Sequence, residues 1–464
     1  MKIKSHQSFT IISVFFALIY VALSIVPHFN FQTNAFDLGI FNQAIQQYAH
    51  LEIGPNTVRE VPTLFADHFE ILPLILSPLY WLFGSYTLLL VQILSTILGA
   101  LGIFLLVKKE TKDPKLALGA ITIFYLFFGL ITALAFDYHN NTVGTMLIPW
   151  LFYLISIRKF YAYYGILALF LLCKENLALI SAFLGISLIF FEDKKIKKHG
   201  LITLIASILY FVVILKVIAY LNGGIYDHWP YSALGDGPLD AIKNIFLHPI
   251  EITSLLFDQP EKIKSWILIL ASGGALAIFK PKYSILIVPI IAQKFFADAP
   301  AFWGYTFHYT VELAPIIAIG SILAIHKFKK LKYTAVIALI LVNIGILSAA
   351  TLYNGDNFTK IFTTDHYRTT YDKKDLKTAI ALIPTNSSVS AQNTIVPHLK
   401  TKTIYQLPKI NNAEFIIINL NDSNIWPISN QETLKTIVRN LQTNPSYKEA
   451  FESNGIHLFE HQSP

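Results

Sequence analysis

The chain has 464 residues, of which 54% are hydrophobic and only 14% are charged. Because soluble globular proteins usually carry about a quarter charged residues, most of this chain does not face water. Its net charge of +7 does not indicate nucleic-acid binding, because the basic residues lie at the ends of apolar segments.

Apolar segments long enough to cross a bilayer recur along the chain. A helix needs about 20 apolar residues to span the hydrocarbon core, and helices are required there because lipid offers the backbone no hydrogen-bond partner. Clear examples are Ile11–Val26, Thr87–Val107, Lys115–Ala135, Leu201–Leu221 and Tyr333–Leu352. With the intervening segments, about eleven spans are expected. The sequence therefore predicts an α-helical polytopic membrane protein, and we interpret its first apolar run as an uncleaved helix.

Lysines and arginines indicate how the chain is oriented. If the N-terminus is cytoplasmic, most of those before residue 353 fall in the short inner loops, as is typical of membrane proteins. Phe69–Gly84 is apolar but short and is interrupted by Pro73 and Pro78. Counting it as a span would break the charge alternation, so we interpret it as interfacial or re-entrant. The predicted localisation is the cell membrane, with the C-terminal region extracytoplasmic.

The region after Tyr353 changes in character. Short strand-like and helix-like patterns alternate there, and the first helix is followed by Pro384. The expected elements are a helix at Asp372–Ile383, strands at Ser388–Ala391, Thr403–Gln406 and Glu414–Asn419, a helix at Gln431–Gln442 and a strand at Gly455–Glu460. These patterns predict a small extracytoplasmic α/β domain at 353–464, after a transmembrane domain at 1–352.

Ionisable side chains gather at the predicted outer ends of the helices. Placing ionisable residues near a membrane costs free energy, so a group of them indicates a function. Its members are Asp37, Arg59, Asp67, His68, Glu70, Asp137, His139, Lys174, Glu175, Asp227, His228, His308 and Glu312. Singly, each of them is most often a solvated loop residue, but their joint distribution favours a site on the outer side.

Local alternatives exist for several of these residues. Asp67 and Glu70 are three apart and would share one helical face, where acidic residues suit a first turn. Lys174 and Glu175 are adjacent, so each needs a different partner if it is buried. His308 and Glu312, four apart, could form an ordinary surface pair. Carboxylates and imidazoles of this group could hold Mn or Mg, but their spacing does not indicate a metal site, and no cofactor is expected.

Several short motifs together resemble a known family. They are Phe36–Gln43, His68-Phe69-Glu70, Asp137-Tyr138-His139, Lys174-Glu175-Asn176, His308-Tyr309-Thr310 and Val389–Asn393. As a set, they resemble a prokaryotic family of predicted multi-pass membrane proteins of unknown function. That family in turn resembles the GT-C glycosyltransferases, which use lipid-phosphosugar donors. Asp37 matches the catalytic Asp of their first outer loop, although many GT-C enzymes carry an acidic pair there.

This resemblance implies a GT-C-like fold and a transfer reaction. A sugar would move from a polyprenyl-phosphate donor to a glycan, lipid or protein acceptor at the outer face, with Asp37 as the base. Donor or acceptor binding would fall to the remaining residues: Arg59, Asp67, His68, Glu70, Asp137, His139, Lys174, Glu175 and His308.

Two other functions remain open from the sequence. One is a transporter or flippase of lipid-linked substrates, although such proteins usually place ionisable residues at the bilayer midplane. The other is a non-catalytic membrane scaffold that presents the C-terminal domain.

Overall fold

The computed structural model describes residues 2–224, 226, 229–352 and 358–462; Asp227 and His228 lie outside this part. Contacts divide the chain into two compact units. The first, called the helical unit, comprises Met1–Val21, His68–Leu72 and Val91–Lys360. The second, called the sheet unit, comprises Ala22–Asp67, Pro73–Leu90 and Ile361–Pro464. The C-terminal residues thus share a compact unit with two segments from the first 90 residues of the chain.

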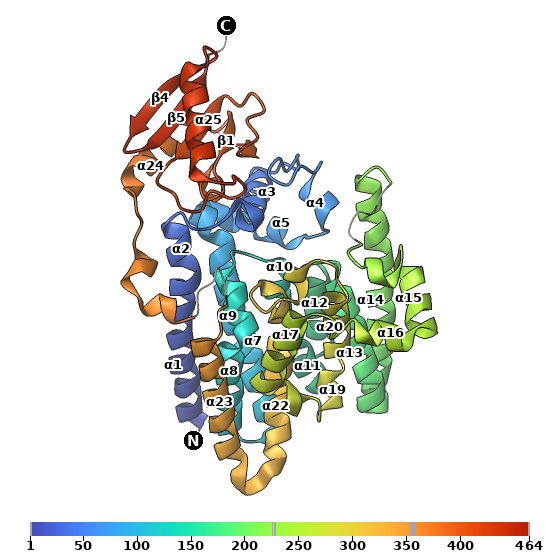
Figure 1. The fold of residues 1–464 in the computed structure, drawn as a ribbon. Coiled ribbons are helices and arrows are strands. Elements are labelled where there is room, and N and C mark those ends of the chain that lie inside the picture. The colour runs from blue at the N-terminus through green and yellow to red at the C-terminus, as the bar shows by residue number, and fades with distance from the viewer. Residues whose placement is uncertain (1, 225, 227–228, 353–357, 463–464) are drawn as a thin grey trace. The chain divides into compact units, whose positions relative to one another are not determined.

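Helices make up most of the helical unit (Figure 1). Their bounds are α1 Lys2–Tyr20, α7 Thr87–Thr111, α8 Pro114–Leu126, α9 Phe128–Ala135, α10 Asn140–Thr145, α11 Ile148–Ser156, α12 Phe160–Leu171, α13 Leu177–Phe191, α14 Lys194–Leu221, α15 Pro238–Leu247, α16 Pro249–Ser254, α17 Pro260–Ile269, α18 Ala275–Ala277, α19 Pro281–Ser284, α20 Ile287–Phe295, α21 Pro300–Trp303, α22 Ala314–Ile325 and α23 Lys332–Ala349.

Four helical stretches of the described chain are long and apolar enough to cross a membrane: Ser5–Phe29, Leu72–Thr111, Lys194–Leu221 and Pro300–Ala349. A fifth candidate is the pair α8 and α9, bent by 47°. The bend lies at Phe127, whose backbone is extended and ends α8. These five stretches contain four of the five apolar segments that the sequence singled out, and all but the last three residues of the fifth, Tyr333–Leu352. The total of about eleven spans stays a prediction.

Polar contacts between apolar helices fix α1 against α8. Ser13 Oγ and Tyr125 Oη lie 2.9 Å apart, and Tyr20 Oη donates to the carbonyl of Tyr125 at 2.8 Å. The ring of Phe16 stacks on Tyr125 at 4.8 Å. All four side chains are buried. Because buried polar groups need partners, these hydrogen bonds fix how the two helices pack.

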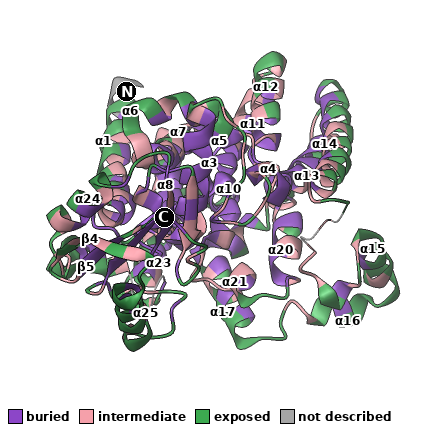
Figure 2. Ribbon diagram, turned by 90° about the horizontal axis from the view of Figure 1, so that it is seen from above, coloured by how far each residue is buried: buried purple, intermediate pink, exposed green. Residues whose placement is uncertain are grey.

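Some helices expose large apolar side chains at the protein surface. Leu201, Ile205 and Leu209 of α14 are each about half exposed or more. Figure 2 shows α14 with much exposed surface, whereas α8 and α10 are largely buried. Large exposed apolar surfaces mark contact with another apolar phase. The protein is a membrane protein, and this face of α14 suits lipid.

The sheet unit contains a five-stranded sheet in the order β2-β1-β3-β5-β4. Neighbours β2, β1 and β3 run parallel, whereas β5 runs antiparallel to β3 and β4. The bounds in this unit are α2 Val26–Phe29, α3 Ile40–Ala49, α4 Leu64–Asp67, α6 Tyr80–Phe83, α24 Lys373–Ala381, β1 Ser388–Ala391, β2 Thr403–Gln406, β3 Phe415–Asn419, α25 Gln431–Thr443, β4 Tyr447–Ser453 and β5 Ile456–His461, and α5, at Leu72–Leu76, straddles the two units.

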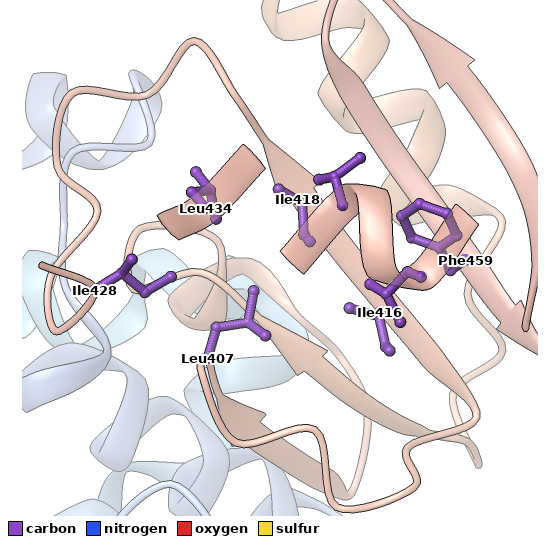
Figure 3. Packing of buried hydrophobic residues seen from close by; sticks show 8 residues of the cluster. Leu407, Ile416, Ile418, Ile428, Leu434 and Phe459 are labelled. Carbon is purple, nitrogen blue, oxygen red and sulfur yellow. The ribbon is translucent and has the colours of Figure 1, made fainter. Parts of the chain in front are cut away.

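One helix packs on this sheet through an apolar core. Leu434 of α25 lies over Ile416 and Ile418 of β3, and Phe459 of β5 joins them (Figure 3). The apolar residues of α25 recur at helical spacing, while those of β3 form a continuous buried run, as a central strand requires. The predicted small α/β fold at the C-terminal end is therefore confirmed.

Candidate functional site

Asp37 lies in a short π-helical turn, Ala35–Gly39, that leads directly into α3; within this turn the backbone of Phe36 is not helical. The residue is half-buried. Gly39 in the same turn approaches Val396 so closely that a Cβ on the glycine would lie 2.7 Å from Val396 Cγ1. The turn that carries Asp37 is therefore packed against the segment that follows β1.

Three asparagines connect this turn to the C-terminal part of the sheet unit. Asn393 accepts a hydrogen bond from the backbone N–H of Ala35 at 2.9 Å and donates to Asn34 Oδ1 at 2.7 Å. Asn424 donates to the same Asn34 oxygen at 2.9 Å. Asn393 was noticed in the sequence only as part of a motif. In the structure it positions the backbone two residues before Asp37.

We expect Asn393→Leu to destabilise the protein by about 1–3 kcal/mol, because it leaves the buried N–H of Ala35 without an acceptor. Thermal unfolding in detergent would measure the loss. Asn440→Leu, at an exposed position of α25, is the matched control and should change stability far less. Equal losses in the two variants would contradict the role given to Asn393.

Arg59 and Asp67 form an ion pair within the sheet unit. Arg59 Nη2 lies 3.0 Å from Asp67 Oδ1, and Arg59 Nε donates to the same oxygen at 3.1 Å. The Arg59 side chain is 38% exposed, so part of its donor fork remains accessible. The prediction that Asp67 and Glu70 share a helical face was wrong. The helix α4 ends at Asp67, and Glu70 N bonds to His68 O in irregular backbone.

Two crossed ion pairs fix the loop between α12 and α13 to the segment His68–Leu72. Glu175 accepts from His68 Nδ1 at 2.7 Å and from the backbone N–H of Phe69 at 3.2 Å. Lys174 Nζ lies 3.2 Å from Glu70 Oε1, and the Glu70 side chain is 1% exposed. The prediction that Lys174 and Glu175 need separate partners is confirmed. Charged hydrogen bonds of this kind are stronger than neutral ones and fix geometry.

The surroundings of Glu175 keep its carboxylate ionised. Burial alone would raise its pKa, but the charge and hydrogen bond of His68, followed by the charge of Lys174, lower the pKa from 4.5 to about 2. A group with a lowered folded-state pKa stabilises the protein above its unfolded pKa. This stability is lost as the pH falls from 4.5 toward 2.

We therefore expect the wild type to exceed Glu175→Gln in stability by about 3 kcal/mol near neutral pH. The difference should shrink steadily below pH 4.5. Unfolding of the detergent-solubilised protein between pH 7 and pH 3 would measure it. Glu251→Gln, at an exposed carboxylate of the same unit, controls for the loss of one charge. A constant difference across this pH range would refute the assignment.

A fourth ion pair is almost completely buried. Lys294 Nζ lies 3.2 Å from Glu312 Oε1, with side chains 7% and 1% exposed. Asn141 donates to the same oxygen at 2.9 Å, and Lys294 also lies over the ring of Tyr309. Glu312 therefore forms a buried ion pair with Lys294, and not the surface pair with His308 that was considered from the sequence. The sequence signal for it was a lysine in the mostly apolar segment Ile287–Phe295.

Asp137, His139 and His308 lie in one region of the helical unit. Gln92 of α7 holds the turn after α9, donating to the carbonyl of Asp137 and accepting from the N–H of His139. The rings of His139 and His308 stack with centroids 3.4 Å apart. All three residues are more than nine-tenths buried. The predicted outer turn therefore holds its polar side chains inside the unit.

The structure distributes the predicted site residues over both units. Asp37, Arg59 and Asp67 belong to the sheet unit. The helical unit holds His68, Glu70, Asp137, His139, Lys174, Glu175 and His308. Lys294 and Asn141 were not singled out in the sequence, and Glu312 was singled out there without an assigned role. Among the candidate residues of the helical unit, Glu70 and Lys174 pair with each other, and His68 pairs with Glu175.

Comparison with known proteins confirms the predicted fold and family resemblance. The crystal structure of ArnT from Cupriavidus metallidurans bound to undecaprenyl phosphate is similar to this chain with a TM-score of 0.55 at 10% identity, covering 97% of each chain. This likeness supports the GT-C-like fold. No curated protein sequence matches the chain. The family model described as "Predicted membrane protein (DUF2079)" matches residues 27–458, so the chain belongs to that family of membrane proteins.

Proposed function

We propose that this protein transfers a sugar from a polyprenyl-phosphate donor to an acceptor hydroxyl at the extracytoplasmic face of the membrane, with its N-terminus in the cytoplasm. The observation that carries the proposal is the likeness to ArnT over 97% of each chain, in a structure described as bound to undecaprenyl phosphate. The acceptor would be a glycan, a lipid or a protein.

The chemistry needs few protein groups. The acceptor oxygen attacks the anomeric carbon, the bond from that carbon to the phosphate oxygen breaks, and polyprenyl phosphate leaves. Since phosphate is already a good leaving group, no general acid is required, and the proposal includes no cofactor. A base must take the proton of the acceptor hydroxyl, and Asp37 is assigned this role. The oxocarbenium character of the transition state also favours nearby carboxylates.

The remaining candidate residues are assigned to binding the donor and the acceptor. Arg59 keeps donors beyond those bound to Asp67, so it can contact the departing phosphate. Lys174 and His308 are the other candidates for that contact. Glu70, Asp137 and His139 are assigned to hydroxyl groups of sugar or acceptor, whereas His68 and Glu175 position the segment that carries Glu70.

A donor panel tests the reaction itself. Membranes that contain the protein would be incubated with radiolabelled polyprenyl-phosphate sugars, and label would be followed into lipid, glycan and protein fractions. Membranes without the protein are the control. Transfer of label that depends on the protein would establish the class and name the donor.

The same panel can also contradict the proposal. If the folded protein in lipid neither binds nor consumes any polyprenyl-phosphate sugar, the transferase is ruled out. The flippase would then be tested with the same lipids by their movement between leaflets.

A further inference from the structure

The sheet unit contains a cavity of about 1140 Å³. Its walls come from the end of α3, from Tyr80–Tyr86, and from two stretches of the C-terminal region, Lys377–Asn386 and His398–Lys402. Small-molecule sites are typically about 300–1,000 Å³, so there is room for a ligand of two or three rings. The lining includes none of the residues assigned to sugar transfer.

Flat aromatic surface forms one part of this cavity. Trp81 is 64% exposed, yet its indole N–H donates to the carbonyl of Ala49 at 3.0 Å. The ring of His50 lies 4.7 Å from that of Trp81. A large aromatic ring is thus held in place while much of its surface stays accessible. Such a surface suits the apolar face of a ring-shaped ligand.

Buried polar atoms on the lining lack protein partners. Gln46 and Thr401 both line the cavity and are at least nine-tenths buried. Within the described part of the chain, Gln46 Oε1 and Thr401 Oγ1 have no hydrogen-bond partner. Buried polar groups are nearly always paired, so these two atoms point to a hydrogen-bonding ligand.

The charge of the lining is predominantly positive. Lys402 Nζ is paired with Glu52 at 2.6 Å, and both residues line the cavity. Two further lysines of the lining, Lys377 and Lys400, are exposed. Lys377 lies 4.9 Å from the centre of the Phe29 ring, which orients its ammonium group. An anionic ligand would form charge-assisted hydrogen bonds with Lys377 and Lys400.

We propose that this cavity binds an anionic saccharide, either as a soluble glycan or as the head group of a glycolipid. A sugar ring combines apolar faces with edge hydroxyls, which matches aromatic rings interleaved with amides and hydroxyls. An acyl chain does not fit, because Gln46, Thr401 and the lysines would lie unpaired against it. The inference concerns binding alone and does not depend on the proposed transfer reaction.

Binding can be measured directly on the full chain in detergent by isothermal titration. The soluble probes are trigalacturonate and glucose 6-phosphate, with neutral maltotriose and inorganic phosphate as controls. The glycolipid probe is glucuronosyl diacylglycerol in micelles, with galactosyl diacylglycerol as its neutral counterpart. Tighter binding of the acidic glycolipid than of trigalacturonate would identify a membrane source, and the reverse would identify a soluble one.

Variants link the binding to this cavity. The double variant Lys377→Gln, Lys400→Gln should weaken binding of the acidic probe by at least about tenfold. Lys374→Gln, at an exposed position on the same helix outside the lining, is the matched control and should bind as the wild type does. Thr401→Val should weaken the acidic probe and should leave the fold intact, as checked by circular dichroism.

Three results would overturn the inference. One is a folded protein that binds none of the acidic probes. Another is binding of maltotriose or galactosyl diacylglycerol as tight as that of the acidic counterpart. The third is binding of inorganic phosphate as tight as that of glucose 6-phosphate, because the saccharide would then contribute nothing.

Discussion

Replacing Asp37 by asparagine is expected to lower the rate of sugar transfer by a factor of about 10²–10⁴. Asparagine keeps the size of the side chain but cannot accept the proton of the acceptor hydroxyl. The turn around residue 37 should stay in place, because Asn393 holds it through the backbone of Ala35 and through Asn34. The loss should therefore appear in kcat, with the unfolding temperature unchanged.

Initial rates with the donor found in the panel would measure this effect. Glu60→Gln is the matched control, since Glu60 is a carboxylate of the same unit that forms an exposed ion pair with Lys409. It should keep full activity. Equal rates for the wild type and Asp37→Asn would remove Asp37 from the role of base. Loss of activity together with a lowered unfolding temperature would contradict the expectation that Asn393 holds the turn in place.

Local sequence patterns predicted many of the helices and strands, because the signal for such an element comes from neighbouring residues and not from residues far along the chain. The predicted strands Ser388–Ala391 and Thr403–Gln406 match β1 and β2 residue for residue. Helix α25 differs from its prediction by one residue at its end. The apolar run predicted from Leu201 belongs to a longer helix, because Asp193 caps it and accepts from the N–H groups of Lys195 and Ile196.

Strand β4 was not predicted from the sequence, because its residues give only a weak strand signal. It lies at the edge of the sheet and alternates between half-buried and exposed residues, many of them polar. The turn after it held the stronger signal. Asn454 and Gly455 both have positive φ and join β4 to β5, and an Asn-Gly pair between alternating residues is typical of a hairpin.

The partners within the candidate site could not be predicted from the sequence. His68 and Glu175 are 107 residues apart, and nothing local to either residue indicates the other. The sequence showed only that Lys174 and Glu175, being adjacent, need different partners. The same holds for Lys294 and Glu312, each of which is unusual alone because it is charged within an apolar stretch. A charged residue within an apolar stretch indicates that its side chain needs a partner if it is buried, but only the fold shows which residue is that partner.

Replacing Lys294 by methionine is expected to destabilise the protein by about 3–5 kcal/mol, the range for breaking a buried ion pair. Methionine has similar volume but leaves the carboxylate of Glu312 buried, with only Asn141 as a hydrogen-bond donor. The double variant with Glu312→Gln removes both charges and keeps an oxygen for Asn141. It should therefore recover most of the loss.

Thermal and denaturant unfolding of the wild type, Lys294→Met, Glu312→Gln and the double variant in detergent would complete a double-mutant cycle. Arg158→Met is the control, because Arg158 and Asp193 form an ion pair whose side chains are 51% and 48% exposed. Exposed pairs are screened by solvent, so this variant should lose far less. If Lys294→Met and the double variant lose the same stability, Glu312 does not need a cation.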